Sequence, residues 1–365
     1  MFSSEARVSL ERVFASELYR GMLVCGRLEV MNAAFEVVAR AIEAGPIPGA
    51  SVALGIGSNL ELACFGRVSS EVDSRAVDLD TVYDLASLTK VLVTVPLLLK
   101  LIEQERLDPF APLLEVLPEI VGFPLEKATV LELVSHTSGL QALSKLRFWQ
   151  LSRETALEKA LTEPLRDSMD ILYSDQGFIV LTYLLEKLYG ARLDVIARDE
   201  LFAPLELNLT YHPEILRCAP TEFVPERGGL IVGQVHDENT AALEGISGHA
   251  GLFGTARDVG LFLANLLEGL VVNPKMLELM CSEVAQASND RRAFGWVMRH
   301  ENWSGGDAAP ENALGHTGFT GTGAWFNPDT QQIHVLLTNR VNPSRDIKSG
   351  ILELRQNFNN IAWKL

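Results

Sequence analysis

Strand-like segments lie near both ends of this chain, and the long stretch between them has a mainly helical pattern. Residues 50–56 and 60–66 are apolar runs joined by G-S-N at residues 57–59, a typical hairpin turn. Further strand-like runs occupy residues 293–299, 323–327 and 333–339. Because strands and helices are segregated rather than alternating, the sequence predicts an α+β fold. One antiparallel sheet would be built from both chain ends and flanked by helices, with a mostly helical lobe inserted.

Helices are indicated where apolar residues recur every three or four positions. In the middle of the chain they cover residues 88–106, a segment starting at 130, residues 178–189 before the C-cap signal Gly190, and residues 259–267. Nearer the ends they cover residues 5–20, 31–44 and 344–363. We expect three parts in one catalytic unit: a helical extension (1–30), an α/β lobe (31–84 and 285–365) and a helical lobe (85–284).

The charge and hydropathy of the chain exclude several classes of partner. The sequence holds 47 acidic and 31 basic residues, a formal net charge of −16, which repels nucleic acid and anionic membranes. Its most apolar stretch, residues 91–102, is too short to span a bilayer and contains Pro96 and Lys100. The first 28 residues contain no apolar run of the kind that a secretion signal needs. We therefore expect a cytoplasmic location, no membrane span and no nucleic-acid partner.

Ser87 and Lys90 form the only S-x-x-K sequence in the chain, at the start of the predicted helix 88–106. Residues three apart share one face of a helix, so the hydroxyl and the amine can meet. A serine is a weak nucleophile until a base or cation activates it, and a helix N-terminus favours an oxyanion. The same pair also fits a helix-capping serine beside a solvated lysine, and the spacing alone does not decide between the two.

Two further segments carry groups suited to proton transfer or substrate binding. Y-S-D at residues 173–175 precedes the helix 178–189, and its phenol can act as a base if a cation lowers its pKa. H-T-G at residues 316–318 leads into a glycine-rich strand that a ligand can approach closely. Each segment alone also fits a structural role, as a packed tyrosine with a capped turn or as a histidine in a glycine-rich hairpin.

In this order, the three motifs resemble the serine β-lactamase and penicillin-binding-protein superfamily. The likeness is strongest to the class C β-lactamases and their DD-peptidase and esterase relatives, and it extends over roughly residues 32–365. That branch carries H-T-S-G-L between the first two motifs, as residues 136–140 do here. The segments V-H-D-E-N (235–239) and G-H-A-G-L-F (248–253) resemble a bacterial subgroup linked to cell-wall turnover. Some of its members are similar to amidases that cleave the bond between N-acetylmuramic acid and L-alanine.

The resemblance implies a β-lactamase/transpeptidase-like fold and a reaction through an acyl-enzyme, without cofactor or metal. It makes Ser87 the acylated nucleophile and Tyr173 the general base, while Lys90 holds a positive charge or accepts the serine proton. The backbone N–H groups of Ser87 and Phe319 would form the oxyanion hole. Four residues would contact the substrate: Asp175, His316, Thr317 and Gly318.

Two departures from the family pattern argue against an efficient β-lactamase. Asp175 stands where β-lactamases have an asparagine, and a carboxylate cannot donate to the acylamino carbonyl of a penicillin. It can instead pair with Lys90 and keep it charged, which shifts the role of base towards Tyr173. His316 replaces a lysine, so a substrate carboxylate is held less firmly at neutral pH. With an ordinary histidine pKa of about 6.5, binding of such a substrate would weaken as the pH rises through that value.

Other candidate chemistry is weaker. His236 and His249 flank Asp237 without a metal-ligand spacing, and we expect a structural or substrate-contact role for them. G-x-S-x-H at residues 245–249 only approaches the nucleophile elbow G-x-S-x-G. The four cysteines form no C-x-x-C motif and predict neither a zinc site nor a disulfide framework.

The sequence therefore predicts a serine hydrolase that acts on a peptidoglycan-derived amide or peptide, or on an ester. One alternative is a weak class C-type β-lactamase. Another, of a different class, is a non-catalytic protein that binds penicilloyl groups or muropeptides.

Overall fold

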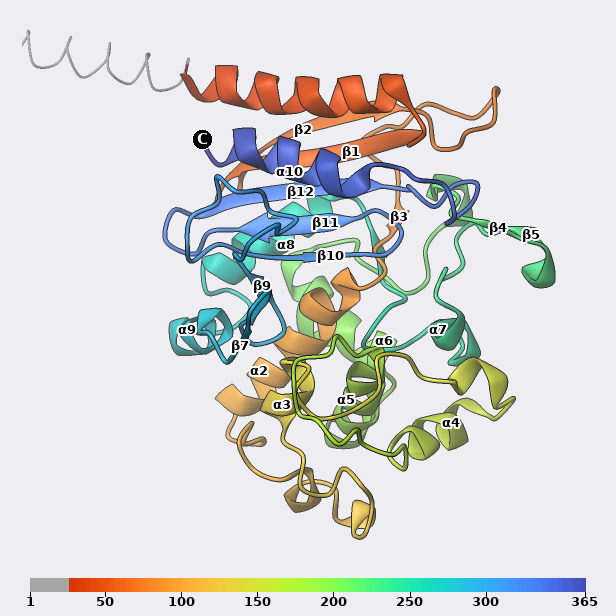
Figure 1. The fold of residues 1–365 in the computed structure, drawn as a ribbon, viewed down its shortest axis with the longest axis vertical. Coiled ribbons are helices and arrows are strands. Elements are labelled where there is room, and N and C mark those ends of the chain that lie inside the picture. The colour runs from red at the N-terminus through yellow and green to blue at the C-terminus, as the bar shows by residue number, and fades with distance from the viewer. Residues whose placement is uncertain (1–25) are drawn as a thin grey trace, which may run out of the picture.

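The main sheet joins the two ends of the described chain. Within residues 26–365, the part that the computed structural model describes, this sheet has eight antiparallel strands in the order β2-β1-β12-β11-β10-β9-β8-β7 (Figure 1). β1 pairs with β12 so that Ala50 lies opposite Thr338. The strand bounds are β1 Gly49–Ile56, β2 Asn59–Gly66, β7 Ala285–Ala287, β8 Asp290–Arg292, β9 Val297–Met298, β10 Leu314–Thr317, β11 Gly323–Phe326 and β12 Gln332–Thr338. The predicted α+β fold is confirmed.

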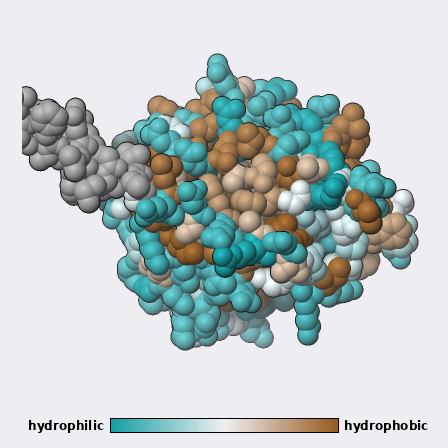
Figure 2. All heavy atoms as spheres, turned by 90° about the horizontal axis from the view of Figure 1, so that it is seen from above, coloured by the Kyte–Doolittle hydropathy of each residue, from teal (hydrophilic) through white to brown (hydrophobic). Residues whose placement is uncertain are grey.

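Side chains alternate between the two faces of the sheet and meet different helices on each. On one face, Val52 and Leu54 of β1 share a core with the helix over residues 26–44 and with α10 (Ile351–Ala362). On the other face, Ala53 shares a core with α8 (Ala256–Leu267). The sheet is therefore a middle layer between helices (Figure 1). Viewed from the side of α10, apolar side chains gather near the middle of the surface, bordered by hydrophilic ones (Figure 2).

Most of the regular secondary structure between β2 and β7 is helical (Figure 1). Besides α8, its α-helices are α2 Val95–Glu103, α3 Val130–Val134, α4 Arg153–Ala160, α5 Asp175–Tyr189, α6 Leu193–Ala197, α7 Glu238–Ala242 and α9 Pro274–Cys281. π-Helical turns cover Lys90–Thr94 and Arg198–Phe202. Short 3-10 turns cover Leu113–Glu115, Pro118–Ile120, Leu146–Phe148, Ala203–Leu205, Ile215–Arg217 and Pro225–Arg227. Two-residue strands pair as β3 (Tyr83–Asp84) with β6 (Phe253–Gly254), and as β4 (Phe223–Val224) with β5 (Gly229–Leu230).

Helix α5 illustrates how local sequence sets an element. Ser174 caps its N-terminus, because the Ser174 hydroxyl accepts a hydrogen bond from the Gly177 N–H. Gly190 ends it in the left-handed conformation, at φ 72°. Its apolar residues, including Phe178 and Leu181, are fully buried in the core. The helix predicted over residues 178–189 is confirmed, and it begins three residues earlier, at Asp175.

Some predicted elements differ from the observed ones. The single strand predicted over residues 293–299 is wrong, because the chain bends at 293–296 and separates β8 from β9. Gly295, at φ 82°, lies in that bend against Val95 of α2. The closing helix begins at Ile351, not at residue 344. The helix predicted over 88–106 is helical from 88 to 103, and its first full turn is a π turn. The helix predicted over 5–20 lies outside the described residues.

No helix among the described residues combines the length and apolar character that crossing a bilayer requires. The cytoplasmic location and the division into residues 1–30, 31–84 with 285–365, and 85–284 remain predictions.

Candidate active site

Ser87 lies on a tight turn directly before the helix that leads into α2. The preceding residue, Ala86, has a left-handed backbone conformation with φ 46°, which is strained for a residue with a Cβ. The Ala86 N–H donates to Asp84 Oδ1 at 2.8 Å, and the Ala86 carbonyl accepts from the Thr89 hydroxyl at 2.7 Å. These bonds hold the strained turn, so the position of Ser87 is set by its neighbours on both sides.

Lys90 is completely buried and holds three acceptors at once. Its ammonium donates to Ser87 Oγ at 2.9 Å, to Asp175 Oδ1 at 2.7 Å and to the His249 carbonyl at 3.1 Å. Burial, the largest single effect, lowers the pKa of Lys90, but the attraction and hydrogen bonding of Asp175 and Tyr173 together exceed it, so that pKa is raised. The ammonium therefore keeps its proton at neutral pH. The predicted pairing of Asp175 with Lys90 is present in the structure.

Tyr173 lies beside Lys90, whose Nζ is 4.9 Å from the centre of the phenol ring. Burial raises the pKa of Tyr173, and Lys90 only partly offsets this effect. The segment carrying Tyr173 is held by His136, whose Nδ1 accepts from the Ser174 N–H at 3.1 Å. The His136 ring also packs on Tyr173, with 4.7 Å between ring centres. This explains the H-T-S-G-L segment, to which sequence reasoning assigned no role.

His316 lies on β10 and is buried, with 3% of its surface exposed. Its Nδ1 is 3.0 Å from the Thr317 carbonyl, while its Nε2 has no partner among the described residues. Burial, with Lys90 and Arg292 nearby, holds the pKa of His316 well below its ordinary value. The expectation of an ordinary histidine pKa is therefore wrong. His316 stays neutral at neutral and mildly acid pH, so it cannot supply the charge that a lysine would.

The glycine-rich loop after β10 is locked to the segment before Ser87. A Cβ on Gly318 would lie 2.1 Å from Thr322 Oγ1 and 2.5 Å from the Leu85 carbonyl, so only glycine fits. The Thr322 hydroxyl donates to the Leu85 carbonyl at 3.0 Å. Phe319, half exposed, stacks on the His236 ring with 5.6 Å between ring centres. Both predicted oxyanion residues, Ser87 and Phe319, thus come from loops that touch.

Ser87 and Tyr173 lie between two cavities. One, of about 390 Å³, is walled by the third motif and by three arginines from β8, the loop after β12 and α10. Its lining residues are Ser87, Tyr173, Arg292, Val297, His316, Thr317, Gly318, Phe319, Arg340, Ile351 and Arg355. The second, of about 310 Å³, is lined by residues that include Asp175, Asp237 and Arg345. A substrate with groups on both sides of its scissile bond has room on both sides of the serine.

The arginines of the first cavity were missed at the sequence level, because no motif surrounds them. Arg292 donates to Asp290 at 2.7 Å, yet its Nε and Nη1 are buried and have no partner within residues 26–365. Arg355 donates to the Gly318 and Thr322 carbonyls, at 3.0 and 2.7 Å, and burial lowers its pKa to about 9. None of the described residues that line this cavity carries a carboxylate, although the chain is strongly acidic. The cavity is suited to an anion.

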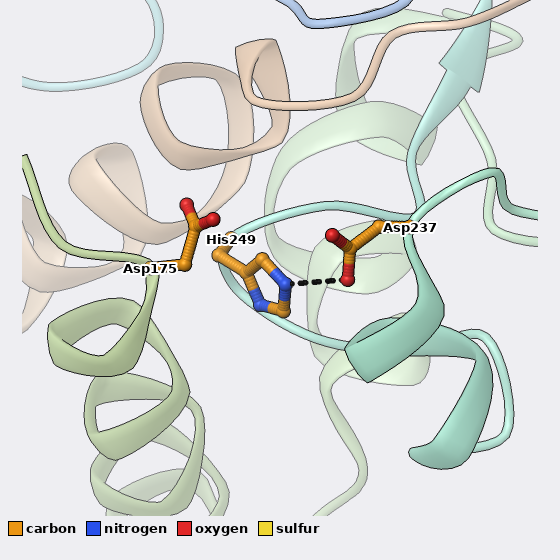
Figure 3. Close-up of side chains that lie close together, drawn as sticks. All are labelled: Asp175, Asp237 and His249. Carbon is orange, nitrogen blue, oxygen red and sulfur yellow. Dashed lines mark hydrogen bonds and ion pairs between the residues drawn. The ribbon is translucent and has the colours of Figure 1, made fainter. Parts of the chain in front are cut away.

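Asp175, Asp237 and His249 each place one possible ligand atom within 4.8 Å of the others. His249 lies between the two carboxylates with its ring turned to Asp237 (Figure 3), and Nε2 is 2.9 Å from Asp237 Oδ1. The Lys90 ammonium already occupies Asp175 Oδ1, so a metal ion here would meet a positive charge. The absence of a metal role remains a prediction. His236 lies apart from this group, 2.9 Å from Glu222.

Ser247, His249 and Asp237 form a second chain of serine, histidine and aspartate. Ser247 Oγ is 2.8 Å from His249 Nδ1, and the ring continues to Asp237. Ser247 is completely buried, however, and its hydroxyl also lies 3.3 Å from Thr182 Oγ1. A substrate cannot reach it, so this chain supports the loop whose carbonyl holds Lys90 rather than competing with Ser87.

Residues 35–356 match the family model described as "Beta-lactamase". The chain belongs to the beta-lactamase family. An N-acetylmuramyl-L-alanine amidase of Bacillus subtilis is 31% identical to this beta-lactamase-family chain over 300 residues, which cover 71% of this chain and 68% of the relative. A putative D-alanyl-D-alanine carboxypeptidase of Salmonella agona is 26% identical over 301 residues, which cover 72% of this chain and 70% of the relative. The predicted serine hydrolase is confirmed at the level of the family.

The fold of this beta-lactamase-family chain is also that of solved structures. A class C beta lactamase from Rhodobacter sphaeroides superposes with a TM-score of 0.71 at 19% identity. The superposition covers 90% of this chain and 98% of that one. The predicted β-lactamase/transpeptidase-like fold is thereby confirmed.

Proposed function

We propose that the protein hydrolyses an amide in a peptidoglycan fragment through an acyl-enzyme on Ser87. The proposal rests on the contacts of Lys90, which holds Ser87 Oγ at 2.9 Å and Asp175 at 2.7 Å between the two cavities. The amidase and carboxypeptidase names of the relatives support this class of substrate. The substrate would carry a carboxylate, because arginines and no carboxylate wall one of the cavities.

In the proposed mechanism, Tyr173 first loses its phenol proton to solvent, with Lys90 beside it to stabilise the phenolate. Ser87 Oγ then attacks the amide carbonyl and gives its proton to Tyr173. The oxyanion forms toward the N–H groups of Ser87 and Phe319. Tyr173 passes the proton to the leaving nitrogen as the C–N bond breaks. Tyr173, again a phenolate, takes a proton from a water molecule as this water attacks the acyl carbon. Tyr173 then gives that proton to Ser87 Oγ as the ester bond between Ser87 and the acyl group breaks.

An efficient β-lactamase is disfavoured by Asp175. Its carboxylate lines the second cavity, where it would repel rather than support an acylamino carbonyl. A non-catalytic binding protein is disfavoured by the intact contacts of Ser87 with Lys90.

The deciding experiment incubates the protein with a muropeptide mixture, a chromogenic cephalosporin and a short-chain nitrophenyl ester, and identifies products by mass spectrometry. Release of peptide or amino acid from the muropeptides supports the proposal, and turnover of the cephalosporin alone contradicts it.

Ser87 should be the single site of covalent attack. We expect a fluorophosphonate to add its mass to the Ser87 peptide and to no other, because Ser87 lines both cavities while Ser247 is buried. Ser87→Ala should abolish labelling and Ser247→Ala should preserve it. Labelling that persists in Ser87→Ala would place the nucleophile elsewhere.

A further inference from the structure

Asp84 is a buried carboxylate that none of the mechanistic steps uses. It has 2% of its surface exposed, and no lysine or arginine among the described residues forms an ion pair with it. A buried charge without a partner is costly unless hydrogen bonds satisfy it. Both of its oxygens accept such bonds, Oδ1 from the Ala86 N–H at 2.8 Å and Oδ2 from the His236 N–H at 2.7 Å. Two backbone N–H groups, and not an ion pair, therefore hold this buried carboxylate in place.

The first bond fixes the turn that carries the nucleophile. Ala86 keeps its strained φ of 46° directly before Ser87, and Asp84 is the acceptor for its N–H. A residue in this backbone region is strained and persists only where its neighbours impose the conformation. The direction of the Ser87 N–H depends on this turn.

The second bond reaches the other side of the site. His236, whose N–H Asp84 accepts, stacks its ring on Phe319 at an angle of 22°. The backbone of Asp84 is tied to the same loop, because its carbonyl accepts from the Thr320 hydroxyl at 2.7 Å. One residue thus contacts the nucleophile turn, the His236 loop and the loop of Phe319.

We propose that Asp84 is a positioning residue that sets the spacing of the two oxyanion N–H groups, on Ser87 and Phe319. The inference rests on the proposed acyl-enzyme mechanism but not on the identity of the natural substrate. Asp84 touches neither substrate nor reacting atoms, and it acts through Ala86 and through His236 and Thr320. Its carboxylate suits this role because it offers two acceptors to two N–H groups at once.

Asp84→Asn tests the proposal. Its amide has only one oxygen, so either the Ala86 or the His236 N–H faces an NH₂ group. The matched control is Asp258→Asn on α8, another buried aspartate, which accepts from Asn208 N–H and the Thr255 hydroxyl far along the chain from Ser87. The readouts are the rate of fluorophosphonate labelling at Ser87, the inhibition constant of phenylboronic acid, the pH profile of labelling and the melting temperature. Phenylboronic acid forms a tetrahedral adduct that places an oxygen in the oxyanion hole.

We expect Asp84→Asn to lower the labelling rate and the boronate affinity by a similar factor, on the order of ten- to a hundredfold. The shape of the pH profile should stay as in the wild type. Asp258→Asn should change the melting temperature but leave both the labelling rate and the boronate affinity at their wild-type values. Labelling and boronate binding near wild-type values in folded Asp84→Asn would overturn the proposal, even with a lower melting temperature.

Thr320→Val provides a second test should Asp84→Asn not fold. It removes the hydroxyl that donates to the Asp84 carbonyl and keeps the shape of the side chain. Labelling and boronate affinity should again fall together, and unchanged values would overturn the proposal. Failure of the proposed mechanism is distinguishable, because the wild-type protein itself would then not be labelled at Ser87.

Discussion

The carboxylate of Asp175 affects both proton-carrying groups beside Ser87. It raises the pKa of Lys90 and adds to the effect of burial in raising the pKa of Tyr173. At neutral pH both groups hold their protons, so neither is a ready base. The base form becomes populated as the pH rises, and kcat/KM should increase toward alkaline pH.

Asp175→Asn should move this alkaline limb to lower pH. The reason is that loss of the negative charge lowers the pKa of Lys90 and of Tyr173 alike. The measurement is kcat/KM of a neutral nitrophenyl ester from pH 6 to 10. Asp170→Asn, on the exposed segment before the motif, is the control and should leave the limb in place. A limb that is unchanged in Asp175→Asn would mean that another group is the base.

The anion preference of the site should come from the arginines and not from His316. We expect Arg292→Gln to reduce kcat/KM for a carboxylated ester relative to its neutral analogue by roughly tenfold or more. Arg291→Gln is the control, because this neighbour on β8 pairs with Glu283 and Glu311 outside the cavity. In the wild type, the ratio of the two esters should not change between pH 5.5 and 7.5, since His316 stays neutral. If the ratio fell as the pH rose from 5.5 to 7.5, His316 would be charged at the lower pH and would contribute to the anion preference.

At the scale of elements, contacts between distant segments decide where local patterns fail. The run 293–299 has the composition of one strand, but it bends at Gly295, which has a φ of 82° and lies against Val95 at the start of α2. Likewise, Ser87 and Lys90 are predictable from their i, i+3 spacing, whereas nothing local shows that Arg292 and Arg355 come to the same cavity. The burial that keeps His316 neutral is also a tertiary effect. The motifs could therefore be identified from the sequence, but not the charges around them.

Gly295→Ala should destabilise the junction of the sheet and α2. The added Cβ would lie 2.2 Å from Val95 Cγ2, and the backbone has φ 82°. Gly245→Ala is the matched control, because Gly245 has φ 83° and nothing within 4 Å of the added Cβ. We expect about 1 kcal/mol of lost stability for the control and about 2–4 kcal/mol for Gly295→Ala in urea unfolding. Equal losses of stability in the two variants would show that Val95 can move away from the added Cβ without cost.

For the whole molecule, buried neutral histidines make stability depend on pH. Burial lowers the pKa of His136 and His316 well below the ordinary value, and that of His334 to about 4. The unfolded chain therefore binds more protons below about pH 6.5, and the folded state loses stability as the pH falls toward 4. The shift of His334 alone corresponds to about 3 kcal/mol.

Urea unfolding midpoints at pH 7.5, 6.0 and 5.0 measure this loss. His334→Phe should flatten the decline between these values, because the ring lies inside the core and its protonation would no longer oppose folding. His300→Phe, near the surface, should leave the decline unchanged. Parallel declines in the wild type and His334→Phe would show that His334 does not contribute.

The pairing of β1 with β12 bears on how the chain folds as it leaves the ribosome. The β1–β2 hairpin is synthesised long before β12, the strand that pairs with the inner edge of β1. A two-stranded hairpin is at best marginally stable alone, and an unpaired edge invites other chains. The edge of β1 that pairs with β12 therefore stays open to other chains until β12 has been synthesised. Ser87 and His316 line the same cavity, and they can come together only after β10 has been synthesised, so a translation product that stops before β10 lacks part of the candidate site.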